Sequence, residues 1–114
     1  MSHLRYEEPV PATPADVVAA LERGDPQAAA RALVGAAFHH PDRQAVQDLC
    51  LRLLGGEDRP LAAVAATCLG HLARIHGQLD AEAVRAALDR QRGDPLVGPR
   101  AEDALDDIDT YLST

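Results

Sequence analysis

Five carboxylates lie within eight residues near the end of the chain, and no basic residue interrupts them. They form the acidic cluster, which consists of Glu102, Asp103, Asp106, Asp107 and Asp109. On a helix, three of them share one face, because residues three and four positions apart are neighbours. Like charges at this spacing repel, and carboxylates late in a helix oppose its dipole, each at a cost of about 0.3–1 kcal/mol. The pattern predicts either a face that binds Arg and Lys side chains of a partner or a solvated face that keeps the protein soluble.

The histidines are the other residues that could add chemistry. His39, His40, His71 and His76 could meet near the ends of two helices, but a zinc site needs three or four convergent ligands. Only His71 beside Asp107 is a plausible pairing, as an ion pair or as an acid–base dyad. The acidic cluster also lacks the loop spacing of a calcium site. We therefore predict no metal and no cofactor.

No residue pattern supplies a nucleophile or a phosphate cradle. Cys50 and Cys68 fall on apolar helical faces, which favours buried free thiols, although a disulfide between them stays open. There is no Walker-type loop and no dinucleotide-binding glycine pattern after a strand. We predict that the protein is not an enzyme. The alternative, a small enzyme or ligand binder that uses His71 and Asp107, predicts a deep polar pocket.

Composition narrows the possible partners. The chain has 114 residues, which suits one domain, and a formal net charge of −7. An acidic surface repels phosphate backbones, so we predict no nucleic-acid partner and favour a basic protein partner. No apolar run is long enough to span a membrane and no secretory signal opens the chain, so we expect no membrane association and a cytoplasmic location.

The most apolar helix predicted is Pro60–His76. Its apolar residues recur at steps of three and four, from Leu61 to Ile75, and Gly77 suits the left-handed cap that ends a helix. A helix this apolar must be covered on most sides, so we predict that it is central. Gly70 predicts close packing of a neighbouring backbone, or else a bare patch open to a ligand.

The other helices are predicted on both flanks of this one. Residues 1–12 read as an extended arm, and residues 13–114 as a single helical domain without a sheet. Thr13, Asp25 and Asp80 are predicted N-caps, and Pro41-Asp42 is predicted to open the third helix. The predicted helices cover about residues 14–23, 26–39, 42–54, 60–76 and 98–113, and one more helix follows Asp80 and ends before the break at Gly93.

The breaks between helices repeat. Asp25, Asp58 and Asp94 each stand in a Gly/Asp/Pro break before a longer helix, 33 and then 36 residues apart. Spacings of this size are typical of helical-pair repeats. Seven residues after each Asp comes an alanine, namely Ala32, Ala65 and Ala101. We predict an all-α fold, an α-solenoid of three antiparallel helix pairs; a bundle of three pairs without superhelical stacking is the alternative.

Residues 66–77, Ala-Thr-Cys-Leu-Gly-His-Leu-Ala-Arg-Ile-His-Gly, and 101–109, Ala-Glu-Asp-Ala-Leu-Asp-Asp-Ile-Asp, resemble small single-domain bacterial HEAT-like repeat proteins. Some members of that group are similar to immunity proteins of polymorphic toxin systems. In HEAT-like stacks the second helix of each pair lines the concave face. The resemblance therefore implies a shallow protein-binding groove bordered by Thr67, His71, Arg74, Asp103, Asp106 and Asp107.

Together these observations predict a non-enzymatic protein-binding module. The function that we favour is an immunity protein that binds and blocks a basic toxin domain by steric occlusion. The predicted partner-binding residues are Thr67, His71, Arg74, Glu102, Asp103, Asp106, Asp107 and Asp109. The alternative function is a HEAT-like scaffold or adaptor that bridges other proteins.

Overall fold

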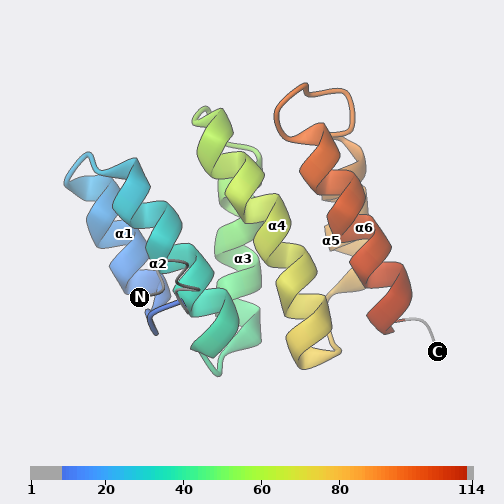
Figure 1. Cartoon of the computed structure of the whole chain (residues 1–114), viewed down its shortest axis with the longest axis horizontal. Helices are drawn as coiled ribbons and strands as arrows, with labels where there is room; N and C mark the ends of the chain where they lie inside the picture. Colours follow the sequence, from blue (N-terminus) through green and yellow to red (C-terminus); the bar gives the residue numbers. More distant parts are fainter. Residues whose placement is uncertain (1–8, 113–114) are drawn as a thin grey trace, which may run out of the picture.

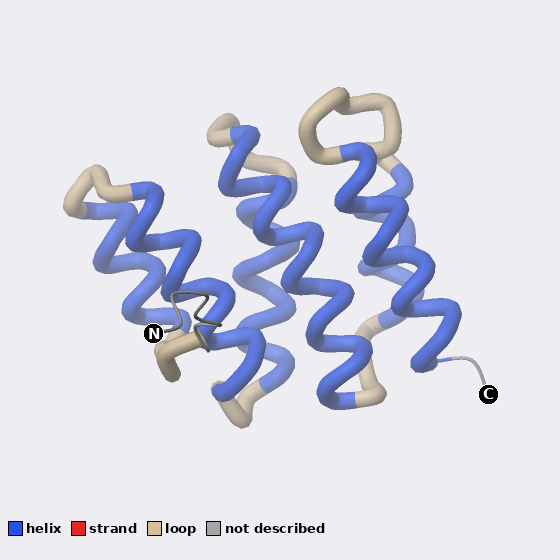
Figure 2. The backbone as a smooth tube through the Cα atoms, in the orientation of Figure 1, coloured by secondary structure: helices blue, strands red, loops and turns tan. Residues whose placement is uncertain are grey.

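The structure, a computed structural model, describes residues 9–112. Its helices are α1 (Pro14–Glu22), α2 (Pro26–His39), α3 (Arg43–Leu54), α4 (Arg59–His76), α5 (Ala81–Asp89) and α6 (Gly98–Leu112). Short loops and turns join them, and no strand occurs in this part of the chain (Figure 2). The all-α prediction is confirmed.

The helices form two layers. Helices α2, α4 and α6 lie side by side in one layer, and α1, α3 and α5 lie behind them (Figure 1). Helix α4 is in the middle and packs against α2, α3 and α6. Its central place confirms the prediction from its apolar pattern. Residues 9–12 of the predicted arm lie outside any helix, and residues 1–8 lie outside the described range.

Side-chain caps set most helix starts. Thr13 and Asp16 form a reciprocal capping box at α1, and Asp25, Asp42 and Asp58 accept the N–H groups three residues later. Asp80 stands at the N-cap of α5 as predicted, but its side chain makes no capping hydrogen bond. Its backbone N–H instead donates to Oε1 of the buried Gln47 at 2.9 Å, which ties this turn to α3.

The third break differs from the first two. Helix α6 begins at Gly98, four residues after Asp94, because Pro95–Val97 form an extra turn. Asp94 Oδ1 accepts the N–H groups of Leu96 and Val97, and Asp94 Oδ2 accepts Nε of Arg59 at 3.1 Å. The Val97 N–H above all, then the Leu96 N–H and the Arg59 guanidinium, lower the pKa of the Asp94 carboxyl. The three extra residues between the second and third break aspartates thus correspond to an ordered turn, which Arg59 bonds to the start of α4.

The core centres on α4. Ten of its residues are buried, among them Leu61, Leu69 and Leu72, and Gly77 ends it at φ 62°. Ile75 corrects the predicted pattern, because its side chain is 40% exposed although its spacing matched the buried face.

Two further predictions about the core can be judged. Cys50 and Cys68 are buried and free, and the neighbouring Cys68 thiol together with burial raises the pKa of Cys50. At Gly70, a Cβ would lie 3.2 Å from Cα of Ala104 and 2.7 Å from Oδ2 of Asp107. Gly70 is therefore a close-packing contact between α4 and α6, not an open backbone patch.

Candidate protein-binding face

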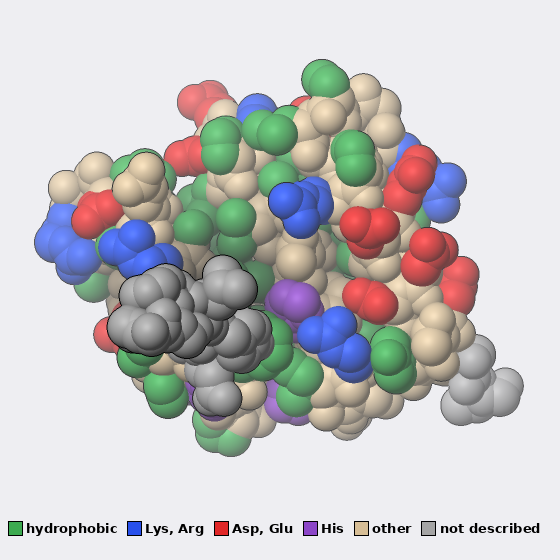
Figure 3. Space-filling view, viewed as in Figure 1, with side chains coloured by type: hydrophobic (Ala, Val, Ile, Leu, Met, Phe, Trp, Pro, Cys, Tyr) green, Lys and Arg blue, Asp and Glu red, His purple; other side chains and the backbone are tan. Residues whose placement is uncertain are grey.

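The predicted partner-binding residues lie on two neighbouring helices of one layer. Thr67, His71 and Arg74 come from α4, and the acidic cluster comes from α6. Carboxylates gather over α6 on the face seen in Figure 3. Glu102, Asp103 and Asp106 are exposed, whereas Asp107 is half-buried against α4. The structure thus brings the two groups together on the face formed by α2, α4 and α6.

His71 sits at the centre of this face. Its Nδ1 is 2.9 Å from a guanidinium nitrogen of Arg74, and its ring centroid is 4.8 Å from that of Phe38 on α2. Burial foremost, and then the Arg74 charge, lower the pKa of His71, while the Asp107 carboxylate raises it in part. Within residues 9–112, His71 bonds to Arg74 and makes no ion pair with Asp107. The geometry is that of a half-buried neutral imidazole rather than an acid–base dyad.

Phe38, His71 and Asp107 occupy the same position of the predicted repeat, thirteen residues after each break aspartate. The Phe38 ring touches His71, and the Asp107 carboxylate acts on His71 from the other side. The three residues therefore form a row across α2, α4 and α6. Along the row the surface changes from aromatic to acidic.

Asp109 behaves differently from the rest of the acidic cluster. Its Oδ1 accepts a hydrogen bond from Arg85 on α5 at 2.6 Å. Within the described range, no ion pair involves Glu102, Asp103, Asp106 or Asp107. These four carboxylates form the unpaired part of the acidic face, and Asp109 is turned toward the other layer.

A groove between α2 and α4 was not predicted. It consists of two hollows of about 560 and 280 Å³ that share Ala30 and Val64. The first hollow is lined by Pro9, Val10, Pro11, Ala12, Asp16, Ala30, Arg31, Ala32, Val34 and Val64, and the second by Pro26, Gln27, Ala30, Asp58, Pro60, Leu61 and Val64. We call it the α2–α4 groove. None of the residues predicted to border a groove lines it, because it lies on the opposite side of α4 from the acidic cluster.

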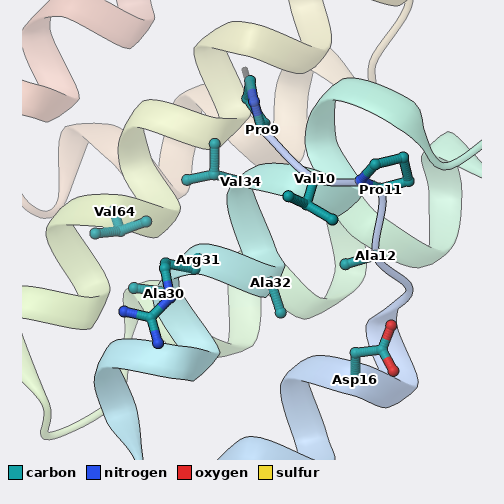
Figure 4. Close-up of a pocket in the computed structure, with 10 residues that line it drawn as sticks. All are labelled: Pro9, Val10, Pro11, Ala12, Asp16, Ala30, Arg31, Ala32, Val34 and Val64. Carbon is teal, nitrogen blue, oxygen red and sulfur yellow. The ribbon is translucent and has the colours of Figure 1, made fainter. Parts of the chain in front are cut away.

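The arm forms one wall of the groove (Figure 4). A Cβ on Gly35 would overlap the backbone carbonyl of Val10, so the arm can lie on α2 only because residue 35 is glycine. Nε2 of His39 is 2.8 Å from the carbonyl oxygen of Pro9, which ties the described part of the arm, residues 9–12, to the last turn of α2. Sequence reasoning missed this wall because Gly35 and His39 carry no local signal of an arm crossing them.

Residues 9–112 contain no group of three or more His, Cys, Asp or Glu side chains placed to hold a metal ion. Across the same range, no helix is both long enough and apolar enough to cross a membrane.

The chain is an all-α protein with an acidic and partly apolar face. No family model matches it, and no curated protein does. It is, however, similar to a chain in the crystal structure of a CDI complex from Cupriavidus taiwanensis LMG 19424, with 31% sequence identity and a TM-score of 0.83. The similarity covers 96% of both chains. This chain therefore belongs to the same family as that component of the Cupriavidus CDI complex.

Proposed function

We propose that this chain is a cytoplasmic immunity protein that binds and blocks a cognate toxin domain. The observation that carries the proposal is the full-length similarity to a component of a CDI (contact-dependent inhibition) complex. We infer that such a complex joins a toxin to the protein that neutralises it. A family member that covers the whole component is expected to share its type of partner.

Two properties of this chain favour the neutralising role over the toxic one. Its net charge of −7 suits a basic partner. The half-buried His71 bonds to Arg74, and within residues 9–112 it makes no ion pair with a carboxylate. The sequence resemblance to HEAT-like immunity proteins points the same way, with three stacked helix pairs as the inferred scaffold.

The mechanism that we infer is steric occlusion by the face of α2, α4 and α6. Glu102, Asp103 and Asp106 are exposed and lack ion pairs within residues 9–112, so a partner's Arg and Lys side chains can reach them. Charges at the rim of an interface chiefly set orientation and association rate. The central, half-buried Thr67 and His71 would be covered when the partner docks.

The test is co-expression with a candidate toxin domain, chosen from the products of the genes that neighbour the gene of this chain. We expect the wild type to restore growth of cells that make this domain and to co-purify with it. The double variant Asp103→Arg, Asp106→Arg should fail at both, since it reverses two exposed charges of the acidic face. A matched control, Glu22→Arg with Glu82→Arg, makes the same charge change on exposed residues of α1 and α5 and should behave as wild type.

The result that would refute the proposal is cell death despite soluble wild-type protein. Capture of several unrelated proteins by both variants would instead support the scaffold alternative.

A further inference from the structure

We propose that the α2–α4 groove receives an apolar anchor of the same partner whose cationic side chains meet the acidic cluster. The inference rests on the proposed function and names the partner's chemistry: an apolar side chain or short apolar segment beside a cluster of Arg or Lys. The groove itself is a second surface, separate from the acidic cluster.

The lining of the groove fits an apolar occupant. Ala30 and Val64 line both hollows, which makes them one continuous depression between the two helices. Val34 and Val64 lie on its α2 and α4 sides, and the arm residue Val10 is 76% exposed beside it (Figure 4). Its acidic side chains already serve the helix starts, since Asp16 belongs to the α1 capping box and Asp58 caps α4. Polar groups that could orient a small polar ligand are therefore scarce, and burial of apolar surface is the available driving force.

The position of the groove links it to the acidic face. Both lie in the α2, α4 and α6 layer, with α4 between them, and Figure 3 shows apolar side chains between α2 and α4 and carboxylates over α6. The axes of packed helices are about 8–10 Å apart. The groove lies about half that spacing from α4 on its α2 side, so the groove and the acidic cluster on α6 are roughly 12–15 Å apart. One protein surface spans this distance easily. The combination matches the anatomy of interfaces, in which an apolar anchor is buried beside charges that orient it.

Charge decides the occupant and its orientation. Arg31 is exposed on the α2 wall and has no ion pair within the described range, so it repels a cationic occupant there. The carboxylates of α6 attract cations at the other end. A second copy of this chain is disfavoured, because two copies that each carry a net charge of −7 repel one another. A partner with its apolar anchor toward α2 and its cations toward α6 satisfies both ends.

The experiment measures the affinity of the candidate toxin domain for two groove variants. Val64→Asp places a charge in the groove, and Ala30→Leu fills it with apolar bulk and keeps it uncharged. We expect each to weaken binding by about 30-fold, as for loss of a hot-spot contact, while circular dichroism shows a folded protein. The matched controls, Val18→Asp and Ala19→Leu, alter exposed residues of α1 in the other layer and should leave the Kd within about twofold of the wild type.

Salt dependence separates the two parts of the face. The groove variants should keep the wild-type dependence of Kd on salt, whereas Asp103→Arg with Asp106→Arg should reduce it. If the wild type binds and both groove variants bind equally well, the groove inference fails and the proposed function stands. If the wild type does not bind, both fail.

A second copy in the groove would also overturn the inference. A wild-type dimer that Ala30→Leu turns into a monomer, in sedimentation, would show that the groove holds another copy of this chain.

Discussion

Single small residues decide how closely the helices of this protein approach one another. Gly70 lets α4 rest against Ala104 of α6, and Gly35 lets the arm rest on α2. A glycine within a helix costs about 1 kcal/mol relative to alanine, so each is kept for the contact that it permits. The sequence suggested this role for Gly70 but offered no sign of it for Gly35, because the arm's path is set by residues far from α2 in the chain.

Gly70→Ala should therefore destabilise the fold despite the better helix propensity of alanine. The added Cβ meets Cα of Ala104, which cannot move without shifting α6, and overpacking of this kind costs about 1–3 kcal/mol. Urea unfolding measures the loss. Gly55→Ala is the control, because its Cβ would enter open space at an ordinary φ of −91°, and its effect should stay within about 0.5 kcal/mol. Equal stability of Gly70→Ala and the wild type would contradict the close contact of α4 and α6.

The titration of His71 tests the row that it forms with Asp107. Burial and Arg74 lower its pKa in the folded state, so the unfolded chain binds a proton at a higher pH than the native chain does. The free energy of unfolding should therefore be greatest above the ordinary histidine pKa of about 6.5 and should fall as the pH drops through the interval between the two values.

Asp107→Asn removes the charge that favours the protonated ring, so the pKa of His71 should decrease further in an NMR titration. Arg74→Gln should raise it. Asp106→Asn serves as the control, because Asp106 is exposed and is not among the groups that shift His71. An unchanged pKa in Asp107→Asn would mean that the α6 carboxylate does not face His71.

At the scale of the helices, the burial of α4 stabilises the fold. Leu69 is fully buried in the middle of α4, and Leu69→Ala should reduce the free energy of unfolding by about 2–5 kcal/mol because it leaves a cavity. Ile75 is on the same helix but 40% exposed, so Ile75→Ala should cost about 1 kcal/mol or less. Calorimetry or urea unfolding compares the two. Equal losses would contradict the central placement of α4.

Local signals accounted for most helix starts and stops. Thr13 and Asp25 cap helices as predicted, Asp42 caps the helix that Pro41-Asp42 was predicted to open, and Gly77 ends α4 in the left-handed conformation. The errors occur where tertiary contacts decide. Asp80 stands at the N-cap of α5 as predicted, but its side chain makes no capping hydrogen bond and its N–H donates to Gln47 of α3. The turn at Pro95–Val97, which Asp94 caps and Arg59 holds, was not predicted.

Only part of the candidate site could be predicted from the sequence, because the rest depends on tertiary contacts. Charge is a local property, so the acidic cluster could be predicted from residues 102–109. The α2–α4 groove depends on the gap between two helices and on the arm that walls it, and neither leaves a periodic pattern. Asp109 shows the limit even for charge, since its pairing with Arg85 joins α5 to α6 across 24 positions of sequence.

At the scale of the whole molecule, the acid surplus is concentrated at one side of one layer. The net charge is −7, and the unpaired carboxylates make the α6 side of this face negative. Arg31 and the apolar groove lie on its α2 side. The proposed role calls for a preformed surface, and α2, α3 and α6 packed against α4 supply one. Family membership with a component of a CDI complex supports the proposal that the partner is a toxin.

The most direct measurement is a calorimetric titration of the purified candidate toxin domain into this chain at low and at high salt. We predict a one-to-one complex that weakens as salt rises, and loss of binding in the double variant Asp103→Arg, Asp106→Arg but not in Glu22→Arg, Glu82→Arg. No binding by the folded wild type, or equal binding by both double variants, would contradict the account of this chain as an immunity protein with an acidic docking face.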